Sequence, residues 1–352
     1  MKIRKIKSIN SMPKDAADPA HQSGNLGRSQ RELKRRFDRI LKGVRSLVAD
    51  QSKYITAKTA NSVEWRPLAF FTNSNGELDT IKTSLTINKS TYYEYKIDSQ
   101  RYDEINSFIE RLLFGEILGS YSGARPPNWF FQSYLSSAFN DGINDAVRAI
   151  QDQSDYEIVG DEINRQIMSL SSDDFNVQAM DSLGLVYSRV FNEMEGLTDE
   201  MKVDLSETLT RGMAGGLGIR AITSDIQKRV GVGFARAQRI ARTEILNAYR
   251  TAQRNKSKEI NDTVYKGSRF EMLQLWFSAL AATSRIWHVK KHGEIYTEQE
   301  VSDFYLERGN AINCLCSQSP ILVYKKTGKP VVDGTVKRLQ DQKEQYLKDG
   351  AK

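Results

Sequence analysis

The chain has 352 residues, of which 39% are hydrophobic and 27% are charged, and its formal net charge is +7. This length suggests two or three domains, or one domain with appendages. No run of eighteen apolar residues occurs, and no apolar segment follows the basic N-terminus, so we expect no membrane-spanning helix, no signal peptide and no membrane partner. Two cysteines are too few for the disulfide framework of a small secreted protein, which indicates folding in a cytoplasm.

The positive charge is concentrated at the N-terminus. Residues 1–50 contain 13 Lys or Arg and 5 Asp or Glu, a net of +8, so the rest of the chain sums to about −1. Residues 1–27 hold few large apolar side chains and are expected to form a disordered basic leader. Residues 28–50 show apolar positions at helical spacing and predict a basic amphipathic helix. Its candidate DNA- or partner-binding cations are Arg31, Lys34, Arg35, Arg36, Arg39 and Lys42.

The middle of the chain changes from a β pattern to a helical one. Residues 51–98 are rich in β-formers, and Asn73 to Gly76 is a turn signal, which predicts a short β-meander or a loop with strands. The next residues are strongly helical, and small side chains such as Gly142 recur there at every fourth position, which favours close helix packing. The helices expected between residues 99 and 195 span 99–118, 129–150 and 176–194.

Further helices precede a small set of strands. Helices are expected over 198–211, 219–230 and 233–259, with a helix–helix turn at the glycine cluster 212–218. Strands are expected over 270–277, 293–297 and 321–324, and the last residues read as a polar tail with little to bury. The predicted fold class is therefore α+β and mostly helical, with long helices, a small C-terminal sheet module and a short β-rich segment near the N-terminus.

One carboxylate lies in an apolar stripe. On a helical wheel Glu244 falls among Ala237, Ala241 and Ala248, on the face expected to be buried. A buried carboxylate requires a cation, for which Arg285 and His288 are the candidates. An internal ion pair and an active-site acid both remain open, although no nucleophile or second acid is spaced to work with Glu244.

Both cysteines and two of the three histidines lie close together near the C-terminus. His288, His292, Cys314 and Cys316 together offer four ligands that suit a tetrahedral zinc ion. If residues 288–292 are helical, both imidazoles share one face. Zinc usually takes a longer cysteine spacing than C-x-C, so packing as free thiols is favoured over a structural zinc ion. A C-x-C disulfide is disfavoured by its geometry and its very small loop.

One ordered series of motifs contains Arg239, Arg242, Glu244, Trp276, Arg285, His288 and Asn313. This series resembles the phage Mu F-like head morphogenesis family, the minor head proteins of tailed phages. The family pattern is an R-A-x-x-I-A-R-T-E helix, a Trp strand, an Asp-x-x-x-Arg-x-x-His segment, a Gly turn and an Asn-Cys-Arg-Cys ending. This sequence departs from it at Ala281, where the family carries Asp, and at Leu315, where it carries Arg.

The resemblance covers about residues 196–325, and a helix such as 129–150 precedes this core in many members. Composition and periodicity divide the rest of the chain, so the expected segments are a leader (1–27), a basic helix (28–50), a β-rich segment (51–98), a helical domain (99–195), a Mu F-like core (196–325) and a polar tail (326–352). The resemblance implies a structural virion protein, not an enzyme, that associates with the portal protein, possible capsid or scaffold partners and double-stranded DNA. Its expected location is the head near the portal, after assembly in the host cytoplasm.

Two other functions stay open from the sequence alone. One is a zinc-dependent nuclease or hydrolase that uses the Cys/His set with Glu244 as the base, which requires an open coordination position. The other is a DNA-binding accessory factor without a portal role, whose contacts would be directed at phosphates. No cofactor is expected other than a structural zinc ion.

Overall fold

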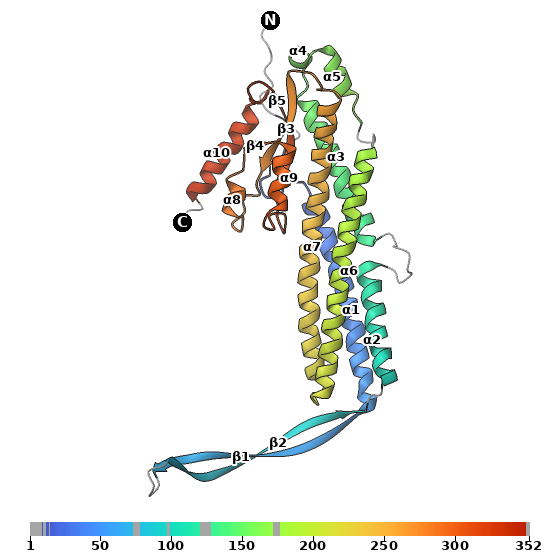
Figure 1. Ribbon diagram of the computed structural model, residues 1–352, viewed down its shortest axis with the longest axis vertical. Coiled ribbons are helices and arrows are strands. Elements are labelled where there is room, and N and C mark those ends of the chain that lie inside the picture. Colours follow the sequence, from blue (N-terminus) through green and yellow to red (C-terminus); the bar gives the residue numbers. More distant parts are fainter. Residues whose placement is uncertain are drawn as a thin grey trace. The chain divides into compact units, whose positions relative to one another are not determined.

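The computed structural model describes residues 9, 12–13, 15–72, 78–96, 99–119, 128–171 and 177–349. The chain divides into two compact units, each built from segments far apart in sequence. The first unit contains Met1–Arg35, Ser122–Leu197 and Phe234–Lys352, and the second contains Arg36–Tyr121 and Thr198–Gly233. Figure 1 labels the elements of both units. The long helices α1 (Ser23–Asp50), α6 (Val177–Ala214) and α7 (Ile219–Asp262) each contribute residues to both.

The first unit combines helices with a small antiparallel sheet. Its sheet has the order β4-β3-β5, and β3 pairs with β5 along its whole length, from Phe270 opposite Tyr324 to Phe277 opposite Ser317. The predicted strands and the mostly helical α+β fold class are confirmed. The remaining elements are η3 (Phe131–Leu135), α3 (Ser136–Asp152), α4 (Tyr156–Val159), α5 (Asp161–Met168), β3 (Phe270–Phe277), α8 (Ile286–Val289), β4 (Ile295–Tyr296), α9 (Glu298–Leu306), β5 (Ser317–Tyr324) and α10 (Gly334–Asp349).

The second unit contains a long β-hairpin. Strand β1 (Ile55–Thr72) pairs antiparallel with β2 (Leu78–Tyr95), with a register shift around Pro67, which has no N–H to donate to the ladder. The β-rich segment is confirmed, and the turn predicted at Asn73 to Gly76 lies outside the described residues. The unit also contains η1 (Gln51–Tyr54), α2 (Ser99–Leu113) and the π-helical turn η2 (Phe114–Leu118).

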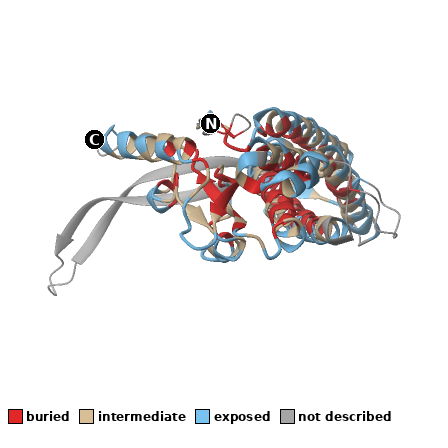
Figure 2. Cartoon of the chain, turned by 90° about the horizontal axis from the view of Figure 1, so that it is seen from above, coloured by how far each residue is buried: buried red, intermediate tan, exposed pale blue. Residues whose placement is uncertain are grey.

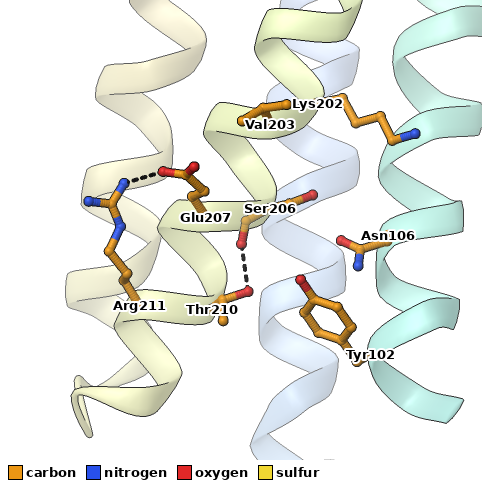
Figure 3. A pocket seen from close by; sticks show the side chains of 8 residues that line it. All are labelled: Tyr102, Asn106, Lys202, Val203, Ser206, Glu207, Thr210 and Arg211. Carbon is orange, nitrogen blue, oxygen red and sulfur yellow. Dashed lines mark hydrogen bonds and ion pairs between the residues drawn. The ribbon is translucent and has the colours of Figure 1, made fainter. Parts of the chain in front are cut away.

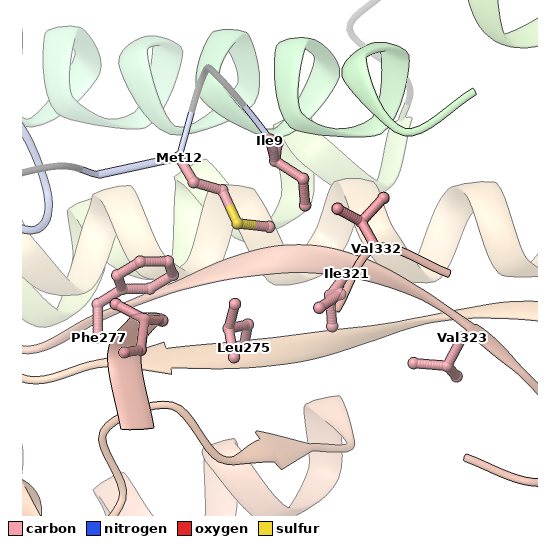
Figure 4. Packing of buried hydrophobic residues seen from close by; sticks show 8 residues of the cluster. Ile9, Met12, Leu275, Phe277, Ile321, Val323 and Val332 are labelled. Atoms are coloured by element: carbon pink, nitrogen blue, oxygen red, sulfur yellow. The ribbon is translucent and has the colours of Figure 1, made fainter. Parts of the chain in front are cut away.

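Both ends of the chain contribute to one apolar core, which corrects two expectations. Ile9 and Met12, placed in a disordered leader, are 2% and 1% exposed, and the Ile9 N–H donates to Thr335 Oγ1 at 3.1 Å. Residues 334–349, placed in a polar tail, form α10, which buries Thr335 and Leu339 and leaves its other residues partly or fully exposed (Figure 2). Figure 4 shows the cluster, which comprises Ile9, Met12, Leu275, Phe277, Ile321, Val323, Val332 and Leu339. Isolated apolar residues in polar segments thus find partners on the sheet.

Helices α6 and α7 are each continuous where the sequence predicted two shorter helices. Gly196 and Gly231 lie inside them, and a glycine within a helix costs only about 1 kcal/mol relative to alanine. The expected turn between the two helices is confirmed at the glycine cluster, where Gly216 has a φ of +66°. Packing along the helices offsets the local preference of these glycines to end them.

The small-residue stripe of α3 packs tightly on α7, as predicted. A Cβ atom on Gly142 would lie 2.4 Å from the Tyr249 carbonyl oxygen and 2.9 Å from the Ala252 Cβ. Both distances are shorter than any normal contact, so only glycine permits this separation of the two backbones. This contact fixes α7, which carries much of the candidate site.

Candidate functional site

The turn that carries both cysteines is fastened to α7 by Asn313. Asn313 has a φ of +57°, a left-handed conformation that Asn tolerates better than most residues. Its N–H donates to Thr243 Oγ1 at 2.9 Å, and its side-chain oxygen accepts a hydrogen bond from Arg242 at 3.0 Å. The R-T-E part of the helix motif and the Asn of the C-x-C motif therefore act as one structural joint.

Arg285 holds the segment that leads into this turn. Its guanidinium donates to the carbonyl oxygens of Asn310 at 3.0 Å and Ile312 at 2.8 Å. The neighbouring Trp287 donates through its indole N–H to the Asn310 side chain at 3.0 Å. A planar guanidinium can satisfy two carbonyls at once, so Arg285 fixes the shape of residues 310–312.

The cation that faces Glu244 comes from α6 and was not predicted. Arg189 donates to the Glu244 carboxylate through Nε at 2.9 Å and through a terminal nitrogen at 2.5 Å. The expectation that Arg285 or His288 pairs with Glu244 is wrong, because both lie against the cysteine turn. Burial raises the pKa of Glu244, and Arg189 opposes this shift. The arrangement is an internal ion pair.

Three of the four predicted metal ligands converge. The His288 Nδ1 atom lies 3.4 Å from the Cys314 sulfur and 3.5 Å from the Cys316 sulfur, and all three side chains are buried. The ligand atoms of these residues lie within 4.8 Å of one another. The Cys316 N–H also donates to the Cys314 sulfur at 3.4 Å. The two thiols are free, so no disulfide joins them.

His292 is not part of this cluster. The helix α8 ends at Val289, so His288 and His292 do not share a helical face as the spacing suggested. The His292 Nδ1 accepts the Ser278 N–H at 2.9 Å, and its Nε2 lies 3.3 Å from the Gln342 side-chain oxygen. Burial lowers the pKa of His292 to about 4. His292 therefore stays neutral at physiological pH and links the end of β3 to α10.

Aromatic rings and a buried arginine enclose the cluster. Trp276, fully buried on β3, stacks on Tyr305 with ring centroids 5.3 Å apart, and Phe304 packs edge-on against His288 at 4.9 Å. The guanidinium of Arg250 lies 4.3 Å from the Tyr305 ring centroid and is fully buried. Only the tertiary structure reveals that Arg250 is buried.

The two thiols differ in acidity. The pKa of Cys314 is lowered because the Cys316 thiol donates to its sulfur and because His288 and Arg250 favour the thiolate. The pKa of Cys316 is raised, since its proton is held by the Cys314 sulfur and its surroundings exclude water.

A cavity of about 150 Å³ opens beside the cluster. Its described lining includes the two thiols, His288, Ser284, Asn313 and two arginines, but no carboxylate. Glu244 does not line it, so the cavity lacks the general base that the hydrolase hypothesis assigned to this residue. Its lining residues are Arg242, Ala279, Ala281, Thr283, Ser284, Arg285, His288, Asn313, Cys314, Leu315 and Cys316.

The motif residues that build this site fall inside one matched segment. Residues 203–319 match a family model described as Phage Mu protein F like protein. Over this segment the chain is similar to the Mu F-like family. The resemblance seen in the sequence is thereby confirmed, and with it the assignment to a bacteriophage head-morphogenesis family. Neither the comparison with curated proteins nor that with solved structures found a match.

The seven motif residues of the Mu F-like segment play mainly structural roles. Arg242, Arg285 and Asn313 shape the cysteine turn, Glu244 pairs with Arg189, and Trp276 fills the core. Arg239 is exposed on α7. The hydrogen-bond partners of these residues could not be read from sequence spacing, because they are far apart in the chain. Glu244 and Arg189 are 55 residues apart, and Asn313 and Arg242 are 71 residues apart.

The basic helix α1 lies outside the matched segment. It buries one apolar stripe, whose members are Leu33, Phe37, Ile40, Val44 and Val48. Arg36 and Arg39 bind the π-helical turn η2, which directly continues α2. Arg39 donates to both oxygens of the Glu116 carboxylate at 2.8 and 2.7 Å, and Arg36 donates to the Glu116 carbonyl oxygen at 2.9 Å. The side chains of Arg31, Lys34, Arg35 and Lys42 are exposed. Of the six predicted contact residues, Arg36 and Arg39 thus bind another part of the protein, whereas the other four are exposed and remain the candidates for contact with a partner.

A second cavity lies between α2 and α6 (Figure 3). It is an open groove of about 700 Å³, lined among others by Tyr102, Asn106, Val203 and Thr210. Lys202 beside it forms an ion pair with Glu110 at 3.0 Å. Its lining residues include no cysteine or histidine, and none of the residues in the sequence motifs lines it.

Within the described residues, no helix is long and apolar enough to cross a membrane.

Proposed function

We propose that the protein is a structural minor head protein of a tailed bacteriophage, which docks near the portal and aids head assembly and genome packaging or delivery. The observation that carries this proposal is the Mu F-like match over residues 203–319, which contains every motif residue of the site. Portal protein is the proposed main partner, with capsid or scaffold proteins as further ones. The proposed location is the virion head, after assembly in the host cytoplasm.

The contacts of the motif residues favour a structural role over catalysis. A hydrolase needs a base near its reacting group, whereas the described lining of the cysteine cavity has no carboxylate. Glu244 is held by Arg189, and Arg285 is used by backbone carbonyls. These contacts hold the fold of the module, which is the role expected of a structural protein.

Double-stranded DNA is the proposed second partner, through the exposed cations of α1. Arg31, Lys34, Arg35 and Lys42 span about 17 Å along the helix at 1.5 Å per residue. Phosphates on one DNA strand recur about every 3.4 Å of helix axis, so several lie within reach of such a row. Arg36 and Arg39 are assigned instead to holding α2. Contacts of this kind depend on salt and not on base sequence.

Co-sedimentation with isolated portal rings tests the docking proposal. The full chain should sediment with the rings, and a variant with Arg31, Lys34, Arg35 and Lys42 changed to Gln should do so equally well. Removing residues 1–50 is unsuitable, because α1 and Met12 belong to the core. Failure of the wild-type chain to sediment would contradict portal docking and favour a DNA-binding accessory factor.

DNA binding is measured on the same proteins across a salt series. Each phosphate contact contributes about 0.9 to the slope of log affinity against log salt, so the four-fold Gln variant should lose up to about 3.6 of that slope. A matched control removes four exposed lysines elsewhere, Lys326, Lys329, Lys337 and Lys348, and lowers the net charge equally. Equal losses in both variants would contradict a binding surface on α1.

A further inference from the structure

Three buried electron-rich atoms meet at the cysteine turn. The His288 Nδ1 atom faces both sulfurs, at 3.4 and 3.5 Å, and all three ligand atoms lie within 4.8 Å of one another. In the absence of a cation, one nitrogen lone pair can accept a hydrogen bond from only one of the two thiols at a time. Both sulfurs therefore converge on one nitrogen, and the three atoms together form a candidate cation site.

The spacing of these atoms matches the edges of a zinc tetrahedron. Zn–S bonds of about 2.3 Å and Zn–N bonds of about 2.0–2.1 Å, at tetrahedral angles, place sulfur and nitrogen about 3.5–3.6 Å apart. The two observed nitrogen–sulfur distances, 3.4 and 3.5 Å, agree with that value. A cation can therefore enter between the three atoms with little movement of the turn.

We propose that His288, Cys314 and Cys316 form a binding site for a divalent zinc ion, with one imidazole and two thiolate ligands. Thiolate and imidazole ligands together select zinc over magnesium or calcium, which prefer oxygen. The Cys316 N–H, which donates to the Cys314 sulfur at 3.4 Å, would offset part of the thiolate charge. Sequence spacing suggested four protein ligands, and the structure reduces the set to three, because His292 is bound to Ser278 and Gln342.

The fourth coordination position faces the adjacent cavity. With a volume of about 150 Å³, this cavity has room for the water molecule that completes a tetrahedron. Ala281 and Ser284 lie in its lining, and neither supplies a carboxylate. The metal would connect the cysteine turn before β5 to α8, which lies 26 residues earlier in the chain. Its role is to close the Mu F-like module, not to activate a water for hydrolysis.

Metal analysis of the full-length chain tests this site. The protein is purified without a histidine tag, and its zinc content is measured by mass spectrometry. One zinc per chain is expected in the wild type, and none in His288→Gln or Cys316→Ser. Replacing zinc with cobalt should produce a thiolate-to-cobalt charge-transfer band in the wild type, which reports sulfur ligation directly.

His292→Gln is the matched control, because His292 is equally buried but lies outside the cluster. It should retain the zinc and the cobalt band, and its loss of both would overturn the three-ligand site. Chelation should lower the unfolding temperature of the wild type but not that of Cys316→Ser. A wild-type chain that is folded by circular dichroism, contains no zinc and shows no charge-transfer band with cobalt would overturn the proposal outright.

Discussion

Gly142→Ala tests the close packing of α3 on α7. The added Cβ would lie 2.4 Å from the Tyr249 carbonyl oxygen, about 1 Å inside the closest ordinary contact. The obstacle is backbone, which cannot rotate away as a side chain can. Inserting a methyl group into a well-packed core costs about 1–3 kcal/mol, and a backbone obstacle favours the upper end. Alanine regains about 1 kcal/mol of helix propensity, which leaves a net loss of about 2 kcal/mol.

Gly196→Ala is the matched control on α6. No atom lies within 4 Å of the Cβ that would be added there, so only the propensity gain of about 1 kcal/mol remains. The two variants should therefore differ by about 3 kcal/mol and have opposite signs. Because both variants are Gly→Ala within a helix, the difference between them measures the steric cost at Gly142 apart from the gain in helix propensity.

Urea unfolding followed by tryptophan fluorescence measures both variants. In a Trp65→Phe background the remaining three tryptophans, Trp129, Trp276 and Trp287, all lie in the first unit, so the signal reports that unit alone. The midpoint should fall for Gly142→Ala and rise for Gly196→Ala at an unchanged slope. A gain in stability for Gly142→Ala equal to that of Gly196→Ala would refute the contact.

Three further predictions follow from buried contacts. Met12→Ala should cost about 2–5 kcal/mol in the same assay, because Met12 is core; a loss near zero would return residues 9–13 to a leader. Wild-type stability should fall as the pH drops from 6.5 towards 4, since the unfolded chain binds a proton that the low pKa of His292 excludes from the fold. In His292→Gln the stability should depend less on pH over this range. Parallel pH profiles of the two proteins would contradict the assignment of the effect to His292. Arg285→Lys should speed hydrogen exchange of residues 310–313, because one ammonium cannot replace the guanidinium fork; unchanged exchange would contradict this role.

Periodicity was sufficient to predict most long helices and the strands of this fold, but not the shorter helices or where every helix ends. The strand expected over residues 270–277 has the same bounds as β3. The breaks predicted near Gly196 and Gly231 are wrong, because packing along α6 and α7 outweighs a glycine's local cost. Helix α10 had a usable signal, since Val332, Val336 and Leu339 recur at helical spacing, but the surrounding charges obscured it.

The sequence was sufficient to predict which residues belong to the site, but not which of them contact one another. Spacing brought His288, Cys314 and Cys316 together correctly, because all three lie in the connections between consecutive strands of one sheet. It misplaced His292, since the argument assumed a helix through residue 292 whereas α8 ends at Val289. It also could not name Arg189 as the partner of Glu244, because which helices lie side by side is decided by packing.

The central claim is that the protein is a structural component of the phage head near the portal. Quantitative mass spectrometry of purified particles, with the portal protein as internal reference, tests it most directly. The account predicts that the chain is present in mature particles at a fixed low ratio to the portal, and that cross-linking joins its Mu F-like segment, residues 203–319, to the portal. Its absence from particles, while it is abundant in the infected cell, would contradict the claim.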